Sequence, residues 1–443
     1  GSTGMVSRIG VGLLGLGTVG GGVASILLSP QERHPLVSEL ELVRVAVRDL
    51  QRPRPMELPP QLLTTDPEAV VSDPSVDVVV EVIGGIEPAR SLIMQAIQAG
   101  KSVVTANKAV IARHGQEIAQ AAAKAGVYVL IEAAVGGGIP IIEPLKQSLG
   151  GNRIDRVSGI INGTTNYILT RMANEGVAYA DVLAEAQRLG YAEADPAADV
   201  DGLDAADKIA ILSTLAFGGA VDRSAVPTEG ISQLQGRDVE YARQLGYGVK
   251  LLAVAERMQG ASPETALPLS LRVQPTLVPQ DHPLAGVHGV NNAILVEGDP
   301  IGRVMFYGPG AGEGPTASAV VADILNIAGI RQASADHGKG SLDPLLAAGS
   351  WRDCVLVNPD KIRQRHYVRF NTSDTPGVIG RIGSCFGDRN VSIQSIVQFN
   401  ATEAGAEIVV ITHEVSQGRM TDALKTIREM PEVSGLAAHL GCL

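Results

Sequence analysis

Apolar and polar positions alternate in a regular way over the first 135 residues. The stretch "RIGVGLLGLGTVGGGVASILL" (8–28) predicts a buried strand, a glycine-rich turn and a helix. Apolar strand patterns follow at 41–47, 76–83, 101–108 and 127–135, and the segment 89–100 predicts a helix between two of them. Strands and helices that alternate at this spacing favour a parallel, doubly wound α/β sheet.

The rest of the chain carries two further patterns. Residues 179–190 and 203–218 predict helices, and Asp201 or Gly202 is the expected cap of the second. From residue 366 the order is strand, helix, strand, strand, helix, and "VSGLAAHL" (433–440) closes it as a strand. This order predicts a separate βαββαβ unit at the C-terminal end.

Composition narrows the class of protein. The 443 residues, 45% of them apolar, predict a compact protein of two or three domains. A net charge of −11 without any lysine- or arginine-rich run argues against nucleic acid or an anionic membrane as a partner. The longest apolar run is too short to span a bilayer, and the three cysteines fit neither a disulfide framework nor a zinc site. We therefore expect a cytoplasmic enzyme.

The glycine-rich turn gives the first chemical signal. In Gly15-x-Gly17-x-x-Gly20, the first glycine permits a tight turn, the second lets backbone approach a pyrophosphate, and the third lets helix pack on strand. The N-terminus of the next helix offers unpaired N–H groups and a positive dipole end. A dinucleotide-binding domain is the prediction.

Two basic residues follow strands of this domain. Arg48 ends the second strand, where NAD-specific sites usually carry an acid, and an arginine there favours the 2′-phosphate of NADP. A solvated arginine is nearly as good an explanation. Lys108, in "VTANKAV", lies just past the carboxyl end of a strand, where such sheets bind ligands, although loop lysines are usually solvated.

Acidic residues raise the question of a cation. Glu132 precedes a bend of three glycines, and carbonyls of such a bend with one carboxylate suit a monovalent cation. More often, a glycine run only lets two segments approach closely. The stretch "GYAEADPAADVDGLDAADK" (190–208) holds six acids, but their spacing does not fit a calcium-binding EF-hand loop.

Within that stretch, Asp204 and Lys208 stand four residues apart on the inward face of the predicted helix. A partly desolvated lysine beside a carboxylate can donate a proton to a developing alkoxide. An ordinary surface pair is the alternative, and Asp199, Asp201 and Asp207 fit caps or solvated acids.

Five motifs together resemble one family. "GLGTVG", "VTANK", "EAAVGGGIPI", "GIINGTTNYILTRM" and "GYAEADPAADVDGLDAADKIAIL" follow one another as in homoserine dehydrogenases, over roughly residues 8–330. The resemblance implies NAD(P)-dependent interconversion of L-aspartate 4-semialdehyde and L-homoserine, on the route to threonine and methionine. It implies Lys208 as proton donor and Lys108 between cofactor and substrate, although sequence does not decide which lysine gives the proton.

The resemblance also assigns binding residues by position. The substrate-binding set is Glu193, Asp204, Asp199 and Tyr191. The cofactor-binding set is Gly15, Gly17, Thr18, Val19, Gly20, Arg48, Gly84, Thr105, Ala106, Lys108 and Gly312. A monovalent cation, sodium by resemblance, is assigned to Glu132 and the carbonyls of Val135, Gly137 and Ile139. NADP is the expected cofactor, with NAD as the alternative.

The C-terminal unit, with "DTPGVIGRI" at its first strand-to-helix turn, resembles an ACT domain. Such domains pair across an interface and often bind a small amino acid at this turn. The resemblance therefore implies a homo-oligomer, dimer or tetramer, and a threonine site that includes Asp374, Gly377, Val378 and Ile379. A domain kept only for oligomerisation is the alternative.

Five regions follow from these patterns and resemblances. They are a Rossmann-type dinucleotide-binding domain (5–133), an α+β substrate-binding and dimerisation domain (134–305), a return segment that packs on the nucleotide domain (306–330), a linker (331–363) and an ACT regulatory domain (364–443). A semialdehyde dehydrogenase is disfavoured because no cysteine precedes residue 354. A catalytically silent NAD(P)-binding amino-acid sensor remains the alternative from another class.

Overall fold

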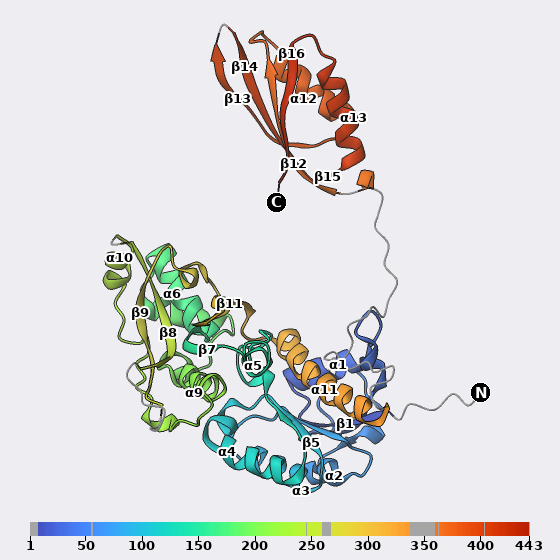
Figure 1. Cartoon of the computed structure of the whole chain (residues 1–443), viewed down its shortest axis with the longest axis vertical. Helices are drawn as coiled ribbons and strands as arrows, with labels where there is room; N and C mark the ends of the chain where they lie inside the picture. The colour runs from blue at the N-terminus through green and yellow to red at the C-terminus, as the bar shows by residue number, and fades with distance from the viewer. Residues whose placement is uncertain are drawn as a thin grey trace, which may run out of the picture. The chain divides into compact units, whose positions relative to one another are not determined.

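The computed structural model describes residues 8–54, 56–244, 246–258, 267–336, 359–361, 363–402 and 404–442 (Figure 1). The chain divides into two compact units, Gly1–Ala348 and Gly349–Leu443. In the described parts of the chain, no helix is both long and apolar enough to cross a membrane.

The first unit contains an all-parallel sheet of order β3-β2-β1-β4-β5-β6. Its strands are β1 (Ile9–Leu14), β2 (Leu40–Ala46), β3 (Leu63–Thr64), β4 (Val78–Glu81), β5 (Ser102–Thr105) and β6 (Val129–Leu130). β1, β4 and β5 are buried along their whole length, which explains their mostly apolar sequences. The predicted doubly wound sheet is confirmed.

Helices cover both faces of this sheet. α1 (Thr18–Leu28) and α11 (Glu313–Asp336) pack on one face, and α2 (Pro67–Ser72), α3 (Ala89–Gln98) and α4 (Lys108–Ala125) pack on the other. A Cβ on Gly22 of α1 would lie 2.8 Å from the Cβ of Ala317, so α11 packs closely on α1. The chain thus returns to the parallel sheet after residue 312, and α11 continues to Asp336, past the predicted end of the return segment.

The strand predicted over 127–135 is wrong beyond its first half. Within this segment only β6 is a strand, and Glu132–Ala134 form a 3₁₀ turn, η3. The Glu132 N–H donates to Asp323 Oδ2 on α11 instead of to a neighbouring strand. This long-range contact removes the segment from the sheet, and no local pattern encodes it.

A second sheet of the first unit is antiparallel, with order β11-β10-β7-β8-β9. Its strands are β7 (Arg153–Ile160), β8 (Tyr247–Arg257), β9 (Leu269–Pro279), β10 (Asn291–Asp299) and β11 (Gly302–Pro309). The helices of this region are α5 (Ile142–Lys146), α6 (Gly163–Glu175), α7 (Tyr179–Arg188), α8 (Ala197–Val200), α9 (Leu203–Phe217) and α10 (Gly236–Gln244). Ile209 and Leu212 of α9 join Val157 and Ala253 of the sheet in one core, so α9 is fixed against the sheet.

The start of α9 confirms one of the two predicted caps. Gly202 occupies the cap position with φ 82°, a left-handed conformation that glycine adopts without strain. Other short 3₁₀ turns among the described residues are η1 (Pro35–Glu39), η2 (Pro60–Leu62), η4 (Arg223–Ala225), η5 (Pro283–Gly286) and η6 (Pro359–Lys361).

The second unit contains the predicted βαββαβ order, with one short strand added. Its elements are β12 (Arg363–Thr372), α12 (Val378–Asp388), β13 (Ile393–Thr402), β14 (Gly405–Thr412), β15 (Val415–Ser416), α13 (Gln417–Arg428) and β16 (Val433–Cys442). β12 is central, because it pairs with β14, β15 and β16. Both helices pack on one buried apolar cluster that includes Phe370 and Phe386. Residues 337–358 of the predicted linker lie outside the described residues.

Candidate active site

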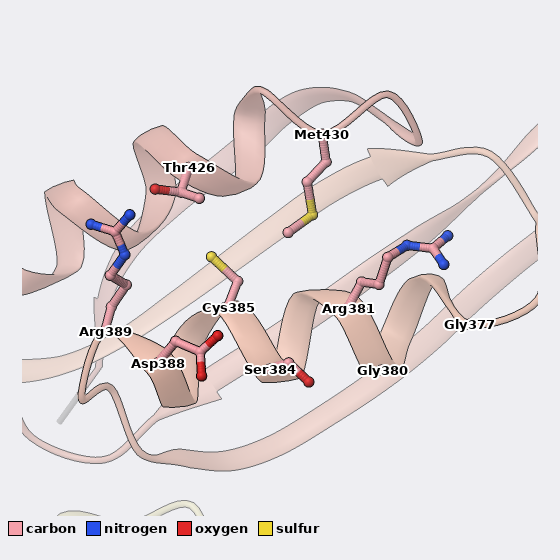
Figure 2. A pocket seen from close by; sticks show the side chains of 9 residues that line it. All are labelled: Gly377, Gly380, Arg381, Ser384, Cys385, Asp388, Arg389, Thr426 and Met430. Carbon is pink, nitrogen blue, oxygen red and sulfur yellow. The ribbon is translucent and has the colours of Figure 1, made fainter.

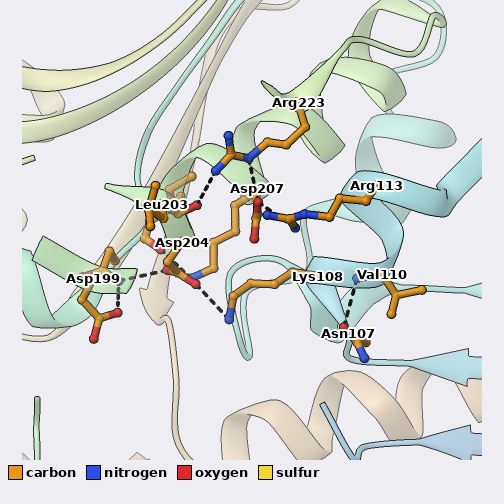
Figure 3. A network of polar contacts seen from close by, with 12 residues as sticks. Asn107, Lys108, Val110, Arg113, Asp199, Leu203, Asp204, Asp207 and Arg223 are labelled. Carbon is orange, nitrogen blue, oxygen red and sulfur yellow. Dashed lines mark hydrogen bonds and ion pairs between the residues drawn. The ribbon is translucent and has the colours of Figure 1, made fainter. Parts of the chain in front are cut away.

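Asp204, in the first turn of α9, lies between two lysines, of which Figure 3 labels Lys108. Lys208 Nζ is 2.8 Å from Asp204 Oδ2, and Lys108 Nζ is 2.9 Å from Asp204 Oδ1. Lys208 stands one turn further along α9, whereas Lys108 begins α4 beside the parallel sheet. The structure therefore brings Lys108 to a pair of residues that is distant from it in the sequence, and both carboxylate oxygens of Asp204 bind an ammonium group.

Polar contacts at the carboxyl end of β5 position Lys108. Asn107 caps α4, because its Oδ1 accepts from the Val110 N–H at 3.1 Å, and its Nδ2 donates to the Gly85 carbonyl at 2.7 Å. The Asn107 N–H in turn donates to Thr105 Oγ1 at 3.0 Å. The "VTANK" motif thus fixes the first residue of α4, and with it the direction in which Lys108 leaves the sheet.

The end of β7 positions the other lysine. Lys208 Nζ donates to the Ile161 carbonyl at 2.7 Å. The next residue, Asn162, donates from Nδ2 to Asp199 Oδ1 at 2.7 Å and to Asp204 Oδ2 at 2.9 Å. Asn162 was not among the predicted site residues, although its place within the specific motif "GIINGTTN" was an available signal.

Charge in this cluster is balanced within the protein. Burial by itself raises the pKa of Asp204, but Lys208 and Lys108 outweigh burial and hold that pKa far below its usual value. Burial lowers the pKa of Lys108, and Asp204 more than compensates, so the lysine stays charged. Asp199 differs, because burial and the nearby Asp204 raise its pKa against the hydrogen bond from Asn162.

Asp207 corrects an expectation. It was expected to be a solvated acid, but its carboxylate is buried between Arg223 Nε at 2.6 Å and Arg113 Nη1 at 3.2 Å. Arg113 lies on α4, so Asp207–Arg113 and Asp204–Lys108 are two ion pairs that join α4 to α9 (Figure 3). Sequence could not pair residues this far apart.

Two predicted substrate residues are exposed. The Tyr191 ring packs edge-on against Tyr167 at 5.0 Å, and the Tyr191 carbonyl accepts from Thr164 Oγ1 at 2.7 Å. Glu193 is exposed, and its carbonyl accepts from Gln187 Nε2. Within the described residues, the structure does not bring the Glu193 carboxylate to either lysine.

The glycine-rich turn has the geometry that a pyrophosphate needs. Gly15 has φ 104°, and a Cβ on Gly20 would lie 2.2 Å from the Gly15 carbonyl oxygen, so the turn and the helix are in direct contact. A Cβ on Gly17 would meet no atom within 4 Å. Gly17 and Thr18 are exposed and Val19 is half-buried, so the N-terminus of α1 is open to a ligand.

The other predicted cofactor residues line the same edge of the sheet or lie near it. Glu81, a fully buried acid that sequence analysis missed, accepts from the Gly84 N–H and from Thr105 Oγ1 at the ends of β4 and β5. The Ala106 N–H donates to the Glu81 carbonyl. Arg48 is exposed just after β2. Gly312, with φ 119°, immediately precedes α11.

The predicted cation ligands are partly engaged by the protein itself. Glu132 is buried, and its two carboxylate oxygens accept from the Ile142 and Glu143 N–H groups at 2.9 and 2.8 Å, which caps α5. The Ile139 carbonyl accepts from the Ile141 N–H at 3.0 Å. Val135 is fully buried and Gly137 has φ 55° in the bend.

Beside Glu132, the structure gathers two carboxylates that sequence analysis missed. Oxygens of Glu132, Glu143 and Asp323 lie within 4.8 Å of one another. Asp323 is fully buried; its Oδ2 accepts from the Glu132 N–H at 2.9 Å, while its Oδ1 has no hydrogen-bond partner in the part of the chain that the structure describes. Burial and the neighbouring acids raise the pKa of Asp323 well above its usual value. Oxygen ligands of this type suit a hard cation.

The predicted regulatory turn lies at the start of α12. Gly377 caps the helix with φ 85°, Val378 is buried, and Asp374 Oδ1 accepts from Gln398 Nε2 at 3.1 Å. Ile379 packs at the edge of the core of this unit. An open depression of about 520 Å³ lies between α12 and α13 (Figure 2). Of the predicted regulatory residues only Gly377 lines this depression; Cys385 and Met430 line it as well.

Comparison with known families accounts for most of the chain. Residues 15–132 match the family model "Homoserine dehydrogenase, NAD binding domain", and residues 140–325 match the model "Homoserine dehydrogenase". Residues 366–432 match the model "ACT domain".

Individual proteins are similar over nearly the whole length. A homoserine dehydrogenase of Synechocystis sp. is 56% identical, over 98% of this chain and 99% of that protein. A solved homoserine dehydrogenase from Thiobacillus denitrificans has a TM-score of 0.68 and 43% identity over 98% of both chains. A hyperthermophilic archaeal homoserine dehydrogenase, solved in complex with NADPH, has a TM-score of 0.60 and 27% identity over 72% of this chain and 97% of its own.

Proposed function

The chain belongs to the homoserine dehydrogenase family, and on that premise we propose that it interconverts L-aspartate 4-semialdehyde and L-homoserine at the Lys108–Asp204–Lys208 cluster. As a member, it is an NAD(P)-dependent oxidoreductase that acts on a CH–OH group, and it carries an ACT domain. The observation that supports the site is the buried Asp204 carboxylate between two ammonium groups, one on α4 and one on α9.

The residues suit the charges that the reaction develops. The bound nicotinamide cofactor supplies or accepts a hydride at the semialdehyde or alcohol carbon. As the semialdehyde is reduced, negative charge grows on its oxygen, and the ammonium groups of Lys208 and Lys108 stabilise it. One of these lysines then gives the proton; Lys208, held by both Asp204 and the Ile161 carbonyl, is our proposed donor.

The acids suit the charged end of the substrate. We assign the substrate ammonium to Asp204 and Asp199, with Glu193 and Tyr191 as further contacts of the bound substrate. Because both oxygens of Asp204 bind lysines here, the substrate ammonium competes with a lysine for one of them. That exchange also frees a lysine ammonium to bind the reacting oxygen.

NADP is the proposed cofactor. Gly15, Gly17, Thr18, Val19 and Gly20 would hold the pyrophosphate; Gly84, Thr105, Ala106, Lys108 and Gly312 are assigned to the nicotinamide half. The exposed Arg48 after β2 would bind the 2′-phosphate. The archaeal relative solved with NADPH supports this choice. Arg48→Ala should raise the KM for NADP⁺ about tenfold and leave that for NAD⁺ unchanged, since one phosphate contact is lost.

A monovalent cation is proposed beside Glu132. The carbonyls of Val135, Gly137 and Ile139 remain the proposed ligands, and the carboxylates of Glu143 and Asp323 are added because they converge on Glu132. Such an ion would neutralise buried negative charge at the point where η3, α5 and α11 meet; no step of the reaction depends on it.

Threonine is the proposed effector at the turn formed by Asp374, Gly377, Val378 and Ile379. Val397 and Phe399 are exposed on β13, an edge strand of the ACT-domain sheet, which supports pairing of two copies into a homo-oligomer. Threonine should lower turnover and raise the thermal midpoint, and Asp374→Ala should weaken both effects. If threonine changes neither property of the wild type, the regulatory proposal is wrong.

The central experiment follows cofactor reduction at 340 nm with L-homoserine, run separately with NADP⁺ and NAD⁺ at mildly alkaline pH. A steady rate that requires homoserine is expected, and the faster cofactor identifies the preference. If a folded protein that binds NADP⁺ gives no rate with either cofactor, the dehydrogenase proposal is overturned in favour of an amino-acid sensor.

A further inference from the structure

Asn162 occupies a special place beside the lysine–aspartate cluster. It follows β7 and is the N-cap of α6, and it is buried. Its Oδ1 accepts from the Thr165 N–H at 2.8 Å and from Thr165 Oγ1 at 3.0 Å. Its Nδ2 donates to Asp199 and to Asp204. A side-chain amide offers two donors and two acceptor positions, so the full hydrogen-bonding capacity of the Asn162 side chain is used.

This pattern fixes the orientation of the amide. If the amide group were turned over, its oxygen would face two carboxylates and its nitrogen would face the Thr165 N–H. Both contacts would be repulsive. The cap on α6 therefore determines that the two amide hydrogens are directed at Asp199 and Asp204.

The consequence is that two like charges are held close together. Asp199 Oδ1 and Asp204 Oδ2 both lie within hydrogen-bond distance of one nitrogen, at 2.7 and 2.9 Å. Asp204 is neutralised by Lys108 and Lys208, while Asp199 has no ion pair among the described residues. The four charges balance, but Asp199 is left without a direct ion pair within the described residues, so the two adjacent carboxylates can bind a substrate ammonium that displaces one lysine from Asp204.

We propose that Asn162 is a positioning residue, which holds Asp199 and Asp204 side by side so that together they bind the ammonium group of the amino-acid substrate. This inference rests on the proposed function of the cluster. Asn162 acts through the two acids and has no contact with the reacting carbon. Its loss should therefore weaken substrate binding much more than turnover of bound substrate.

The decisive variant is Asn162→Ser. Serine is as good an N-cap as asparagine, so α6 keeps its cap, but the two amide donors are lost. We expect the KM for L-homoserine to rise roughly 10- to 100-fold, because hydrogen bonds to buried charged groups are lost, while kcat falls less than about threefold. The thermal midpoint and the affinity for NADPH, from titration of cofactor fluorescence, should remain those of the wild type.

The pH profile gives a second readout. The hydrogen bond from Asn162 lowers the pKa of Asp199, against burial and the charge of Asp204. In Asn162→Ser that pKa should rise, and the charges of Lys108 and Lys208, which also act on Asp199, are unchanged. The acid limb of the kcat/KM profile for reduction of L-aspartate 4-semialdehyde, the direction in which Lys208 acts while protonated, should therefore move to higher pH. A helix cap with only a structural role would not move this limb.

Asp66→Ala is the matched control, because it removes a side-chain N-cap from α2 without touching the cluster. Its KM and pH profile should equal those of the wild type. Two results with an active wild type would overturn this inference. In the first, the KM of Asn162→Ser stays within about twofold of the wild-type KM; in the second, its kcat and its thermal midpoint both fall. If the wild type itself does not oxidise homoserine, the proposed function fails first, and this inference with it.

Discussion

Two clusters of buried carboxylates in the first unit differ in whether the chain supplies their counter-charge. Asp204 lies between Lys108 and Lys208, and these lysines keep its pKa far below the usual value. Asp323, with Glu132 and Glu143, has no such partner, and burial raises its pKa well above the usual value. Lys146 pairs only with Glu143, from the more exposed side.

The two clusters therefore differ in the counter-charge that they require. The Asp204 cluster is ionised and complete, so it can exchange one ammonium group for another when substrate binds. The Asp323 cluster holds more negative charge than a buried site tolerates, so it needs a proton or a cation from solution. Only the Asp204 cluster, with its two ammonium groups, has the composition expected of a site for acid catalysis.

The largest effect is expected for Lys208→Ala. Loss of the proposed proton donor should reduce kcat about 10²–10⁴-fold, as removal of a general acid commonly does. Asp204 keeps Lys108, so the fold should persist, and circular dichroism should be unchanged. Lys146→Ala, which removes the surface lysine of the other cluster, is the control and should keep full turnover in the same 340 nm assay. Near-normal turnover of Lys208→Ala would remove this lysine from the mechanism.

The second prediction concerns Asp323→Asn. If a small cation neutralises its cluster, the thermal midpoint of the wild type should be a few degrees higher in sodium chloride than in tetramethylammonium chloride at equal ionic strength. The reason is that only the small ion can be bound by the carboxylates. Asparagine has nearly the same shape and can still accept from the Glu132 N–H, but it removes one charge. The variant should lose the sodium-specific part of the shift. An equal response in wild type and variant would mean that protons alone neutralise the cluster.

The smallest effect concerns Lys250, a buried cation that has no ion pair with any of the described residues. Its ammonium donates to the Val287 carbonyl and to Asn166 Oδ1, and burial lowers its pKa to about 8. Between that value and the unfolded one near 10.5, the unfolded chain binds more protons than the folded chain. Stability of the wild type should therefore rise with pH across this window, relative to Lys250→Met.

Thermal midpoints of both proteins from pH 7 to 10.5 provide the measurement. Below about pH 8 the difference in thermal midpoint between wild type and Lys250→Met should be constant, because Lys250 is then charged in the folded and in the unfolded chain. Lys146→Met, at an exposed ion pair, is the comparison that should show no such slope. Parallel curves for wild type and Lys250→Met would show that this ammonium is not desolvated.

Local chemistry made much of the fold predictable. The glycine turn between β1 and α1 was found because only glycine permits φ 104° at residue 15 and the 2.2 Å approach at residue 20. The βαββαβ order of the second unit followed from alternation of apolar residues. The 127–135 strand was wrong because its backbone donor binds Asp323, a residue far along the chain.

The candidate site divides in the same way. The sequence alone determined the order of elements, the glycine turn, and the shared helix face of Asp204 and Lys208, because each depends on residues within one or two turns of each other. Tertiary structure alone decided that Lys108 meets Asp204, that Asp207 is buried between two arginines, that Asn162 joins two acids, and that Asp323 lies beside Glu132. These contacts arise where α4 packs on α9, where β7 ends beside α9, and where α11 returns to η3, and the periods of 2 and 3.6 residues carry no information about such distant neighbours.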